Sequence, residues 1–202
     1  MDGVTATSAG HLSGPHHART GDTEESDDAL VLHYLDGDAM AFESLYRRYR
    51  GPLFRFFRRQ VSEPVANDAF QDTWSKLISS LTAYEPRDAF AGYLFTIAHH
   101  VLTDINRREM RNPSGSAEAL EVLESAQHTE AMVEREELQQ RLMQEVHKLP
   151  HAQRSVWLLK QESGLSLTEI AEATSSTLEG VKSRLRYANR KLLAGMQRHV
   201  RR

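Results

Sequence analysis

Apolar residues recur at intervals of three and four along most of the chain, the spacing that places them on one face of an α-helix. Within residues 29–111 the pattern predicts four helices, which begin near residues 29, 38, 64 and 89. Asp38 can cap the second helix, Pro52 should kink this helix without ending it, and Pro64 suits a first turn. No run alternates apolar and polar residues as a strand would, so the predicted fold class is all-α.

The fourth of these helices is predicted to have a buried face and an opposite stripe that can bind a ligand. The buried face is Phe90, Leu94, Ile97, Ala98, Val101 and Ile105. The stripe is Tyr93, Thr96, His100, Thr103 and Arg107, with His99 and Arg108 beside it. Aromatic rings and cations on one stripe suit single-stranded DNA, because rings stack on unpaired bases and cations bind phosphates. Tyr93 considered alone is better explained by packing.

The helical pattern breaks at residues 112–116, Asn-Pro-Ser-Gly-Ser, and resumes near Val133. We therefore expect two small helical domains, residues 29–112 and 137–202, joined by a flexible acidic linker over 113–136. Residues 1–28 lack periodic apolar residues and should form a disordered acidic tail. The tail contains His11, His16 and His17, whose spacing is more typical of solvated side chains than of a metal site.

Charge is divided unevenly along the chain, although its net value is only −3. The tail and the linker each have a net charge of −5, whereas residues 137–202 have +6. Residues 174–202 contain eight basic residues and a single acidic one, Glu179. This distribution indicates that the C-terminal segment contacts a polyanion.

Two helix starts follow one another closely in residues 164–193. Ser166 with Glu169 forms one predicted capping box, and Ser176 with Glu179 forms another. The second helix should bury Leu178, Val181, Leu185, Ala188 and Leu192. Two short-linked helices, the second basic on its outer face, are typical of a helix-turn-helix whose last helix recognises DNA.

The start of a recognition helix enters the major groove, which assigns roles to its exposed side chains. Thr177, Glu179, Lys182 and Ser183, with Ser176 at the helix start, are predicted to face base edges. Arg184, Arg186 and Arg190 are predicted to contact phosphates. The alternative is a solvated charged helix at the end of an ordinary bundle.

Other classes of protein are less compatible with the composition. Apolar runs are too short for a membrane span, and the N-terminus lacks the basic and apolar stretches of a secretory signal, so we expect a cytoplasmic protein without membrane insertion. The chain has no cysteine. We predict no catalytic residue, metal or cofactor. An enzyme would have to use His99 and His100 with Asp104, and a stand-alone helix-turn-helix regulator remains a second alternative.

The motifs together resemble a known family. The segment LSLTEIAEAT followed by VKSRLRYA, after LPHAQRSVWLL, is similar to the fourth conserved region of the bacterial extracytoplasmic-function sigma factors. DGDAMAFESLYRRYRGPLFRF, VANDAFQDTWSKL and RDAFAGYLFTIAHHVLTDINRRE resemble parts of the second region, in the family's order. Two segments depart from the family pattern. Residues 98–100 are Ala-His-His where many relatives have Ala-Arg-Asn, and Ser175 and Ser176 replace the usual glycine and branched apolar residue.

The resemblance implies a dissociable subunit of bacterial RNA polymerase that directs promoter recognition, DNA melting and transcription initiation. The core polymerase would contact the polar face of the third helix, formed by Asp68, Gln71, Asp72 and Ser75. Without the resemblance, that face is better explained as simply solvated. The stripe of the fourth helix would bind the minus-ten element and the last helix the minus-thirty-five element. An anti-sigma factor is a further implied partner.

Overall fold

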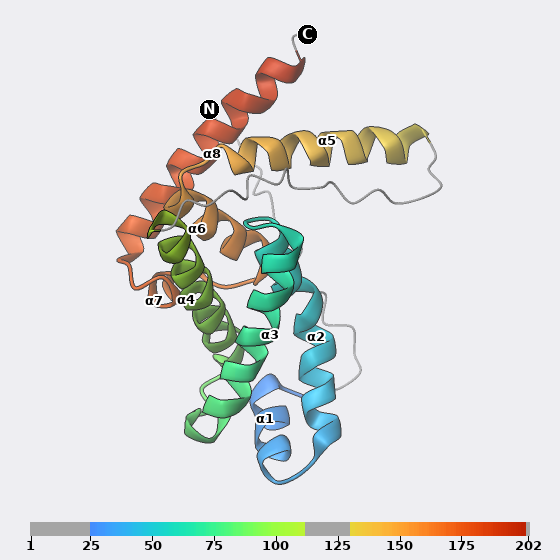
Figure 1. Ribbon diagram of the computed structural model, residues 1–202, viewed down its shortest axis with the longest axis vertical. Coiled ribbons are helices and arrows are strands. Elements are labelled where there is room, and N and C mark those ends of the chain that lie inside the picture. Colours follow the sequence, from blue (N-terminus) through green and yellow to red (C-terminus); the bar gives the residue numbers. More distant parts are fainter. Residues whose placement is uncertain (1–24, 112–129, 201–202) are drawn as a thin grey trace, which may run out of the picture.

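The computed structural model describes residues 25–111 and 130–200 (Figure 1). The predicted tail up to residue 24, with its three histidines, and linker residues 113–129 lie outside this range. The described residues form helices without any strand, which confirms the all-α prediction. The helices are α1 (Asp27–Leu35), α2 (Ala39–Arg58), α3 (Glu63–Ser80), the 3₁₀ helix η1 (Leu81–Ala83), α4 (Phe90–Arg111), α5 (Glu130–His147), α6 (His151–Glu162), α7 (Leu167–Ala173) and α8 (Leu178–Val200).

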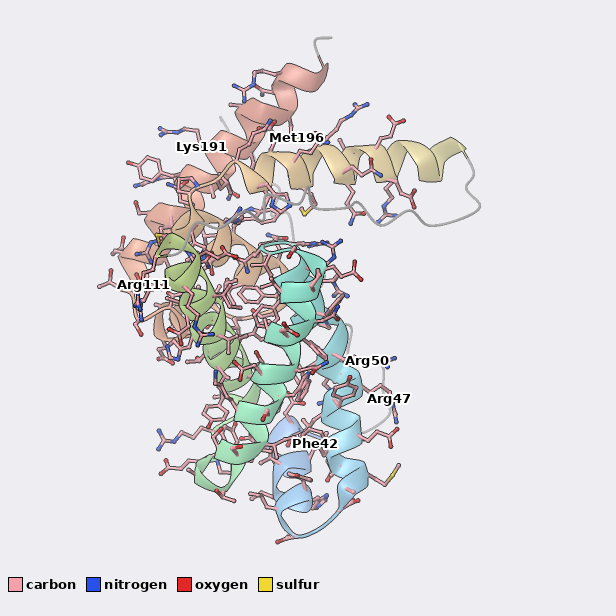
Figure 2. The ribbon with its side chains drawn as sticks, in the orientation of Figure 1. Phe42, Arg47, Arg50, Arg111, Lys191 and Met196 are labelled. Atoms are coloured by element: carbon pink, nitrogen blue, oxygen red, sulfur yellow. The ribbon has the colours of Figure 1, made fainter. Side chains whose placement is uncertain are left out.

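We call the first four α-helices the N-terminal group, and within it α2 and α3 begin where their first residues predict. The carboxylate of Asp38 accepts a hydrogen bond of 2.8 Å from the backbone N–H of Met40 at the start of α2. Helix α2 continues through Pro52, as expected, and Pro64 lies in the first turn of α3. Phe42 packs between α1 and α3, with its ring centroid 5.0 Å from that of Tyr34 and 5.7 Å from that of Trp74 (Figure 2).

The start of α1 is joined to the loop that precedes α4. The Asp28 carboxylate, which is only 8% exposed, accepts hydrogen bonds from the Tyr84 hydroxyl (2.6 Å) and the Asp88 backbone N–H (2.5 Å). Asp88 has a positive φ of 53°, an uncommon backbone conformation for a residue other than glycine. Helix α1 therefore includes Asp27 and Asp28, which the sequence assigned to the tail, and Asp28 fixes a distant loop.

Helix α4 is buried on a broader face than the sequence predicted. Phe90, Leu94, Ala98 and Val101 are buried as expected. Ile97 and Ile105 are only partly buried, however, whereas Phe95 and Leu102 are completely buried. The reason is that α4 packs against α3 on one side and α7 on another, so a single apolar stripe does not describe its environment.

The C-terminal group comprises α5 to α8. Helix α5 begins at Glu130, so a helix occupies the end of the segment that was expected to be linker. Ser166 and Glu169 form the predicted capping box at the start of α7. Helix α8 instead begins one residue later than predicted, because the hydroxyl of Thr177 accepts the N-terminal hydrogen bond, from Gly180 N–H at 3.0 Å.

The turn between α7 and α8 explains this shift. Ser175 has a φ of +48°, and the backbone N–H groups of Ser175 and Ser176 donate hydrogen bonds to the carbonyls of Glu172 (3.0 Å) and Ala171 (2.8 Å). This is the Schellman ending that usually contains glycine, with a serine in its place. The prediction of a capping box at Ser176 was therefore wrong, and Leu178, predicted to be buried, is 38% exposed.

The two groups pack against each other (Figure 1). Helix α6 contacts α2, and α7 contacts α4. Buried side chains from both groups, from Leu30 to Leu192, form one continuous hydrophobic cluster. No pattern in the sequence predicted this packing. Among the described residues, none of the helices has the length and apolar character that a membrane span requires.

Candidate nucleic-acid interface

The polar face of α3 is accessible. Its four predicted residues, Asp68, Gln71, Asp72 and Ser75, are all exposed, and the opposite side of the helix is buried. Asp72 forms an ion pair of 2.6 Å with Lys76, one turn later. Lys76 was not among the residues predicted from the sequence, although its position four residues after an aspartate predicts this pair. The face thus offers two carboxylates, one of them already paired on the surface.

The first part of the α4 stripe is partly covered. Tyr93 is half-buried, its ring centroid lies 5.1 Å from that of Tyr84, and its hydroxyl donates a hydrogen bond of 3.4 Å to the carbonyl of Ser80. The hydroxyls of Thr96 and Thr103 donate to the carbonyls of Gly92 (2.7 Å) and His99 (2.8 Å) within α4. These three polar oxygens can still accept hydrogen bonds, but their protons are engaged.

His99 faces the C-terminal group. Its Nδ1 lies 3.0 Å from the hydroxyl of Ser155, which is completely buried in α6. Burial lowers the pKa of His99 to about 4, and the nearby His151, His100 and Arg184 lower it further. His99 is therefore neutral at pH 7, and in this arrangement it contacts protein at the site where the sequence predicted DNA.

The end of the stripe is open to solvent. His100, Arg107 and Arg108 are exposed, and Arg107 lies 3.5 Å from Asp104 in a weak surface ion pair. That pair engages the carboxylate that the enzyme alternative requires. The described residues contain no group of three or more His, Asp or Glu side chains that could hold a metal ion.

Helix α8 exposes most of its predicted contacts. Thr177, Glu179, Lys182, Arg186 and Arg190 are exposed, and Ser183 is half-buried. Lys182 forms an ion pair of 2.8 Å with Glu179, which lowers the pKa of that carboxyl. Three cations thus lie on successive turns of one helix face, the arrangement that follows a DNA groove and its phosphates.

Two predicted contact residues of this region lie differently. Ser176 and Arg184 are half-buried and bond to each other, so both are engaged within the protein. Tyr187, which was not predicted as a contact residue, is 42% exposed. The guanidinium carbon of Arg190 lies 4.9 Å from the centre of the Tyr187 ring, and that of Arg186 lies 5.8 Å away. Aromatic residues spaced one and three positions from arginines on a helix could have indicated this stacking.

Comparison with known proteins agrees with this organisation. Residues 45–112 match the family model for sigma-70 region 2. The chain is 30% identical over 159 residues to the RNA polymerase sigma factor YlaC of Bacillus subtilis, covering 77% of this chain and 92% of the relative. It is 27% identical over 169 residues to the ECF RNA polymerase sigma-E factor of Haemophilus influenzae, covering 79% of this chain and 89% of that protein.

A solved structure has the same fold. It is the sigma factor RpoE of Bartonella quintana in complex with the anti-sigma factor NepR, with a TM-score of 0.63, 20% identity, and coverage of 77% of this chain and 96% of RpoE. Alignments over 159 and 169 residues are long enough to include parts of both helix groups. This chain belongs to the ECF RNA polymerase sigma factors.

Proposed function

We propose that the chain binds core RNA polymerase through the polar face of α3 and directs it to promoters without catalysis of its own. The stripe of α4 contacts the melted minus-ten element, and α8 reads the minus-thirty-five element. The observation that carries this assignment is that α8 exposes Lys182, Arg186 and Arg190 after a helix-turn-helix, in the same chain as a region-2 helix with an exposed acidic face. The proposed site of action is the cytoplasm.

An anti-sigma factor is part of the proposal. Its support is the likeness in fold to the Bartonella quintana sigma factor, which was solved with such a partner. The relatives described above are all named sigma factors, which gives no support to the stand-alone regulator considered from the sequence.

The test combines binding with transcription. The full chain is mixed with bacterial core RNA polymerase, recovered by pull-down, and assayed for run-off transcription on the DNA upstream of its own gene. We expect a stoichiometric complex and a discrete transcript that depends on the added chain. A chain that neither binds core enzyme nor directs a transcript would contradict the proposal, whereas binding of promoter duplex in the absence of polymerase would favour the stand-alone regulator.

A further inference from the structure

The contact between the two helix groups contains a buried ion-pair cluster. Glu162, at the end of α6, has a side chain that is only 5% exposed. Its carboxylate accepts a hydrogen bond of 2.8 Å from Nε of Arg55 and another from Nη1 of Arg59, both on α2. Burial lowers the pKa of Arg59, and the adjacent charge of Arg55 lowers it further. We call Glu162, Arg55 and Arg59 the Glu162 cluster.

Removing the carboxylate would leave Arg59, whose side chain is 21% exposed, without this partner and beside the charge of Arg55. Breaking one side of a buried ion pair is strongly destabilising because the remaining charge is uncompensated. Two further polar contacts between the groups are uncharged: His99 with Ser155 at 3.0 Å, and Asn106 with His151 at 2.7 Å. Removal of the Glu162 carboxylate should therefore shift the two groups more than removal of either uncharged contact.

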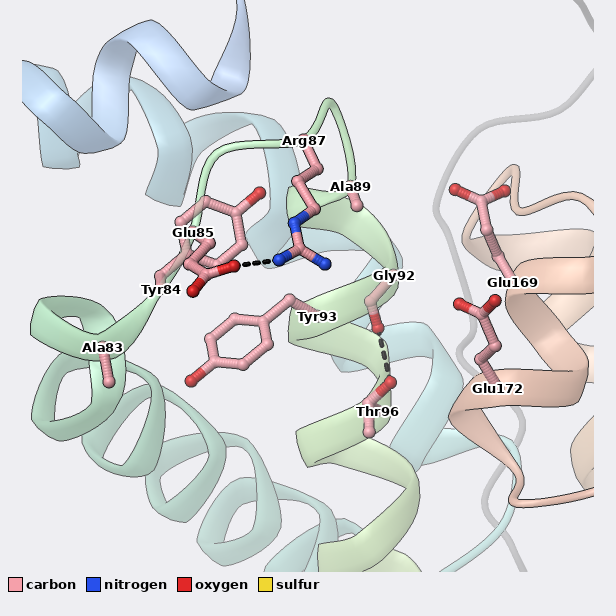
Figure 3. Close-up of a pocket in the computed structure, with 10 residues that line it drawn as sticks. All are labelled: Ala83, Tyr84, Glu85, Arg87, Ala89, Gly92, Tyr93, Thr96, Glu169 and Glu172. Carbon is pink, nitrogen blue, oxygen red and sulfur yellow. Dashed lines mark hydrogen bonds and ion pairs between the residues drawn. The ribbon is translucent and has the colours of Figure 1, made fainter.

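The same packing places acidic side chains opposite the α4 stripe. A cleft of about 330 Å³ lies between α4 and α7 (Figure 3). Tyr93 and Thr96 line one wall, and Glu169 and Glu172 of α7 line the other. Glu169 is held in place by its capping hydrogen bond of 2.7 Å from the backbone N–H of Ser166. The cation that lines the same cleft, Arg87, is paired with Glu85, so the carboxylates of Glu169 and Glu172 are left to repel the phosphates of an approaching strand.

The polymerase face remains free in this arrangement. Asp68, Gln71 and Asp72 on α3 are exposed, and the contacts of the C-terminal group involve α2 and α4. The packing therefore distinguishes between the two ligands: it obstructs the minus-ten surface and leaves the core-binding surface accessible.

We propose that the packed arrangement is a closed state that excludes DNA, that the Glu162 cluster holds it closed, and that the closed chain can still bind core polymerase before it opens. The DNA part of this inference rests on the proposed function, because it takes the α4 stripe as the minus-ten surface. The closed state itself is a property of the free chain and can be measured without any ligand.

Distances between the groups provide the first test. The natural chain has no cysteine, so Arg50→Cys and Lys191→Cys allow two spin labels to be placed on exposed positions of α2 and α8 (Figure 2). We expect a narrow distance distribution in the parent and a broader one with longer distances in Glu162→Arg. The milder Arg55→Gln, at a side chain that is 52% exposed, should shift the distribution in the same direction. Glu137→Gln, which removes a surface pair with Arg141 on α5, is the matched control and should shift nothing.

DNA binding provides the second test. If the closed state outweighs the open state about tenfold, opening should tighten binding of a single-stranded oligonucleotide about tenfold, because apparent affinity scales with the competent fraction. The oligonucleotide is taken from the upstream region of the gene, and core-polymerase affinity should change less than about twofold. Circular dichroism shows which variants are folded, and the milder variant supplies the test if Glu162→Arg is not.

Each part of the inference can fail separately. Unchanged distances in both folded variants would show that the Glu162 cluster does not hold the groups together. Longer distances without tighter DNA binding would show that closure does not exclude DNA. Failure of the proposed function gives a different result from either of these outcomes. The parent chain would then lack core binding and run-off activity, while the distances between the labels would still increase in the variants.

Discussion

The guanidinium of Arg184 donates a hydrogen bond from Nη1 to the hydroxyl of Ser176, 2.7 Å away, and so joins α8 to the turn before it. This turn includes Ser175 at positive φ, where the backbone adopts a conformation that costs a serine more than a glycine. Arg184 thus stabilises the helix-turn-helix itself, whereas Arg186 and Arg190 on the same helix are exposed.

Arg184→Ala should lower the stability of the protein by roughly 1 kcal/mol, the typical net value of one hydrogen bond. Arg186→Ala is the control, since it removes the same side chain from an exposed position of α8 and should change stability by less than about 0.5 kcal/mol. Thermal melting of both variants gives the comparison. Equal melting temperatures for the two would mean that the bond to Ser176 does not support the turn.

Lys182→Ala and Arg190→Ala should affect DNA binding in different ways. Lys182 lies on the second turn of α8, near the end that we propose enters the groove, so its loss should cost about 1 to 3 kcal/mol at particular base pairs and relax preference there. Arg190 lies two turns after Lys182, stacks on Tyr187 and is predicted to contact a phosphate. Its loss should therefore weaken binding to all sequences alike and lower the salt slope by about one. Selection from a promoter library with each holoenzyme measures base preference, and binding at several salt concentrations measures the salt slope. A change in base preference with Arg190→Ala but not with Lys182→Ala would place α8 in a different register on the DNA.

Asp72→Arg should weaken binding to core polymerase while the fold persists. The reversed charge repels a basic partner and also loses the ion pair with Lys76. Glu43→Arg is a matched control because it breaks a similar pair with Arg47 on α2, with comparable exposure of the carboxylate, 54% against 49%. Titration against core enzyme should separate the two variants, and equal affinities would remove Asp72 from the interface.

His99 makes the packing of the two groups sensitive to pH. Its pKa is about 4 in the folded protein and near 6.5 when exposed, so the unfolded chain binds the proton more tightly. The contribution of His99 to stability is therefore complete above pH 6.5 and declines as the pH falls toward 4. The loss is at most about 3 kcal/mol, since one pKa unit corresponds to about 1.4 kcal/mol.

The measurement is denaturant unfolding at pH 7 and pH 4.5. His99→Gln cannot be protonated and should lose less stability over this interval than the parent. His100→Gln, at the exposed neighbouring position, removes only one of the smaller effects that lower the pKa of His99 and should retain most of the dependence. The lowered pKa values of His147 and His151 contribute in the same direction, so part of the dependence will persist in every variant. A parent and a His99→Gln variant with identical pH dependence would contradict the assignment.

Gly195 permits the close approach of α5 and α8. A Cβ atom at this position would lie 2.7 Å from Cγ of Glu145, a buried side chain of α5. Gly195→Ala should therefore destabilise the protein by about 1 to 3 kcal/mol through overpacking. Gly51→Ala in α2 meets only the end of the flexible Arg55 side chain, at 3.2 Å, and should be neutral or stabilising by up to about 1 kcal/mol. Melting curves of both variants show whether each substitution raises or lowers the stability of the protein.

Local signals in the sequence predicted local structure well. Asp38, Pro64 and the Ser166–Glu169 pair each act through atoms within a few residues, so the starts of α2, α3 and α7 could be read from the chain. The start of α8 was misplaced by one residue because Ser175 adopts a conformation that the sequence pattern assigns to glycine.

The candidate site was predictable only in part, because several of its residues depend on contacts distant in sequence. His99 meets Ser155, which is 56 positions away, and Arg55 meets Glu162, which is 107 positions away. A helical pattern places His99 beside the polar stripe but contains no information about which helix covers it. The same limit applies to the core residues Phe95 and Leu102, which periodicity did not identify: the ring of Phe95 packs against Phe56 of α2, with centroids 5.9 Å apart and 39 positions between them in sequence.

The hydrogen bonds of Asp28 have a consequence for how the N-terminus can be altered. This carboxylate holds both Tyr84 and the backbone of Asp88, so the entry to α4 depends on a residue sixty positions earlier. Proteolysis or a truncation that removes the chain up to Asp28 would release the loop beside Tyr93 without touching any predicted DNA contact. Cleavage at the start of the first helix would therefore alter the surface that we propose binds the minus-ten element.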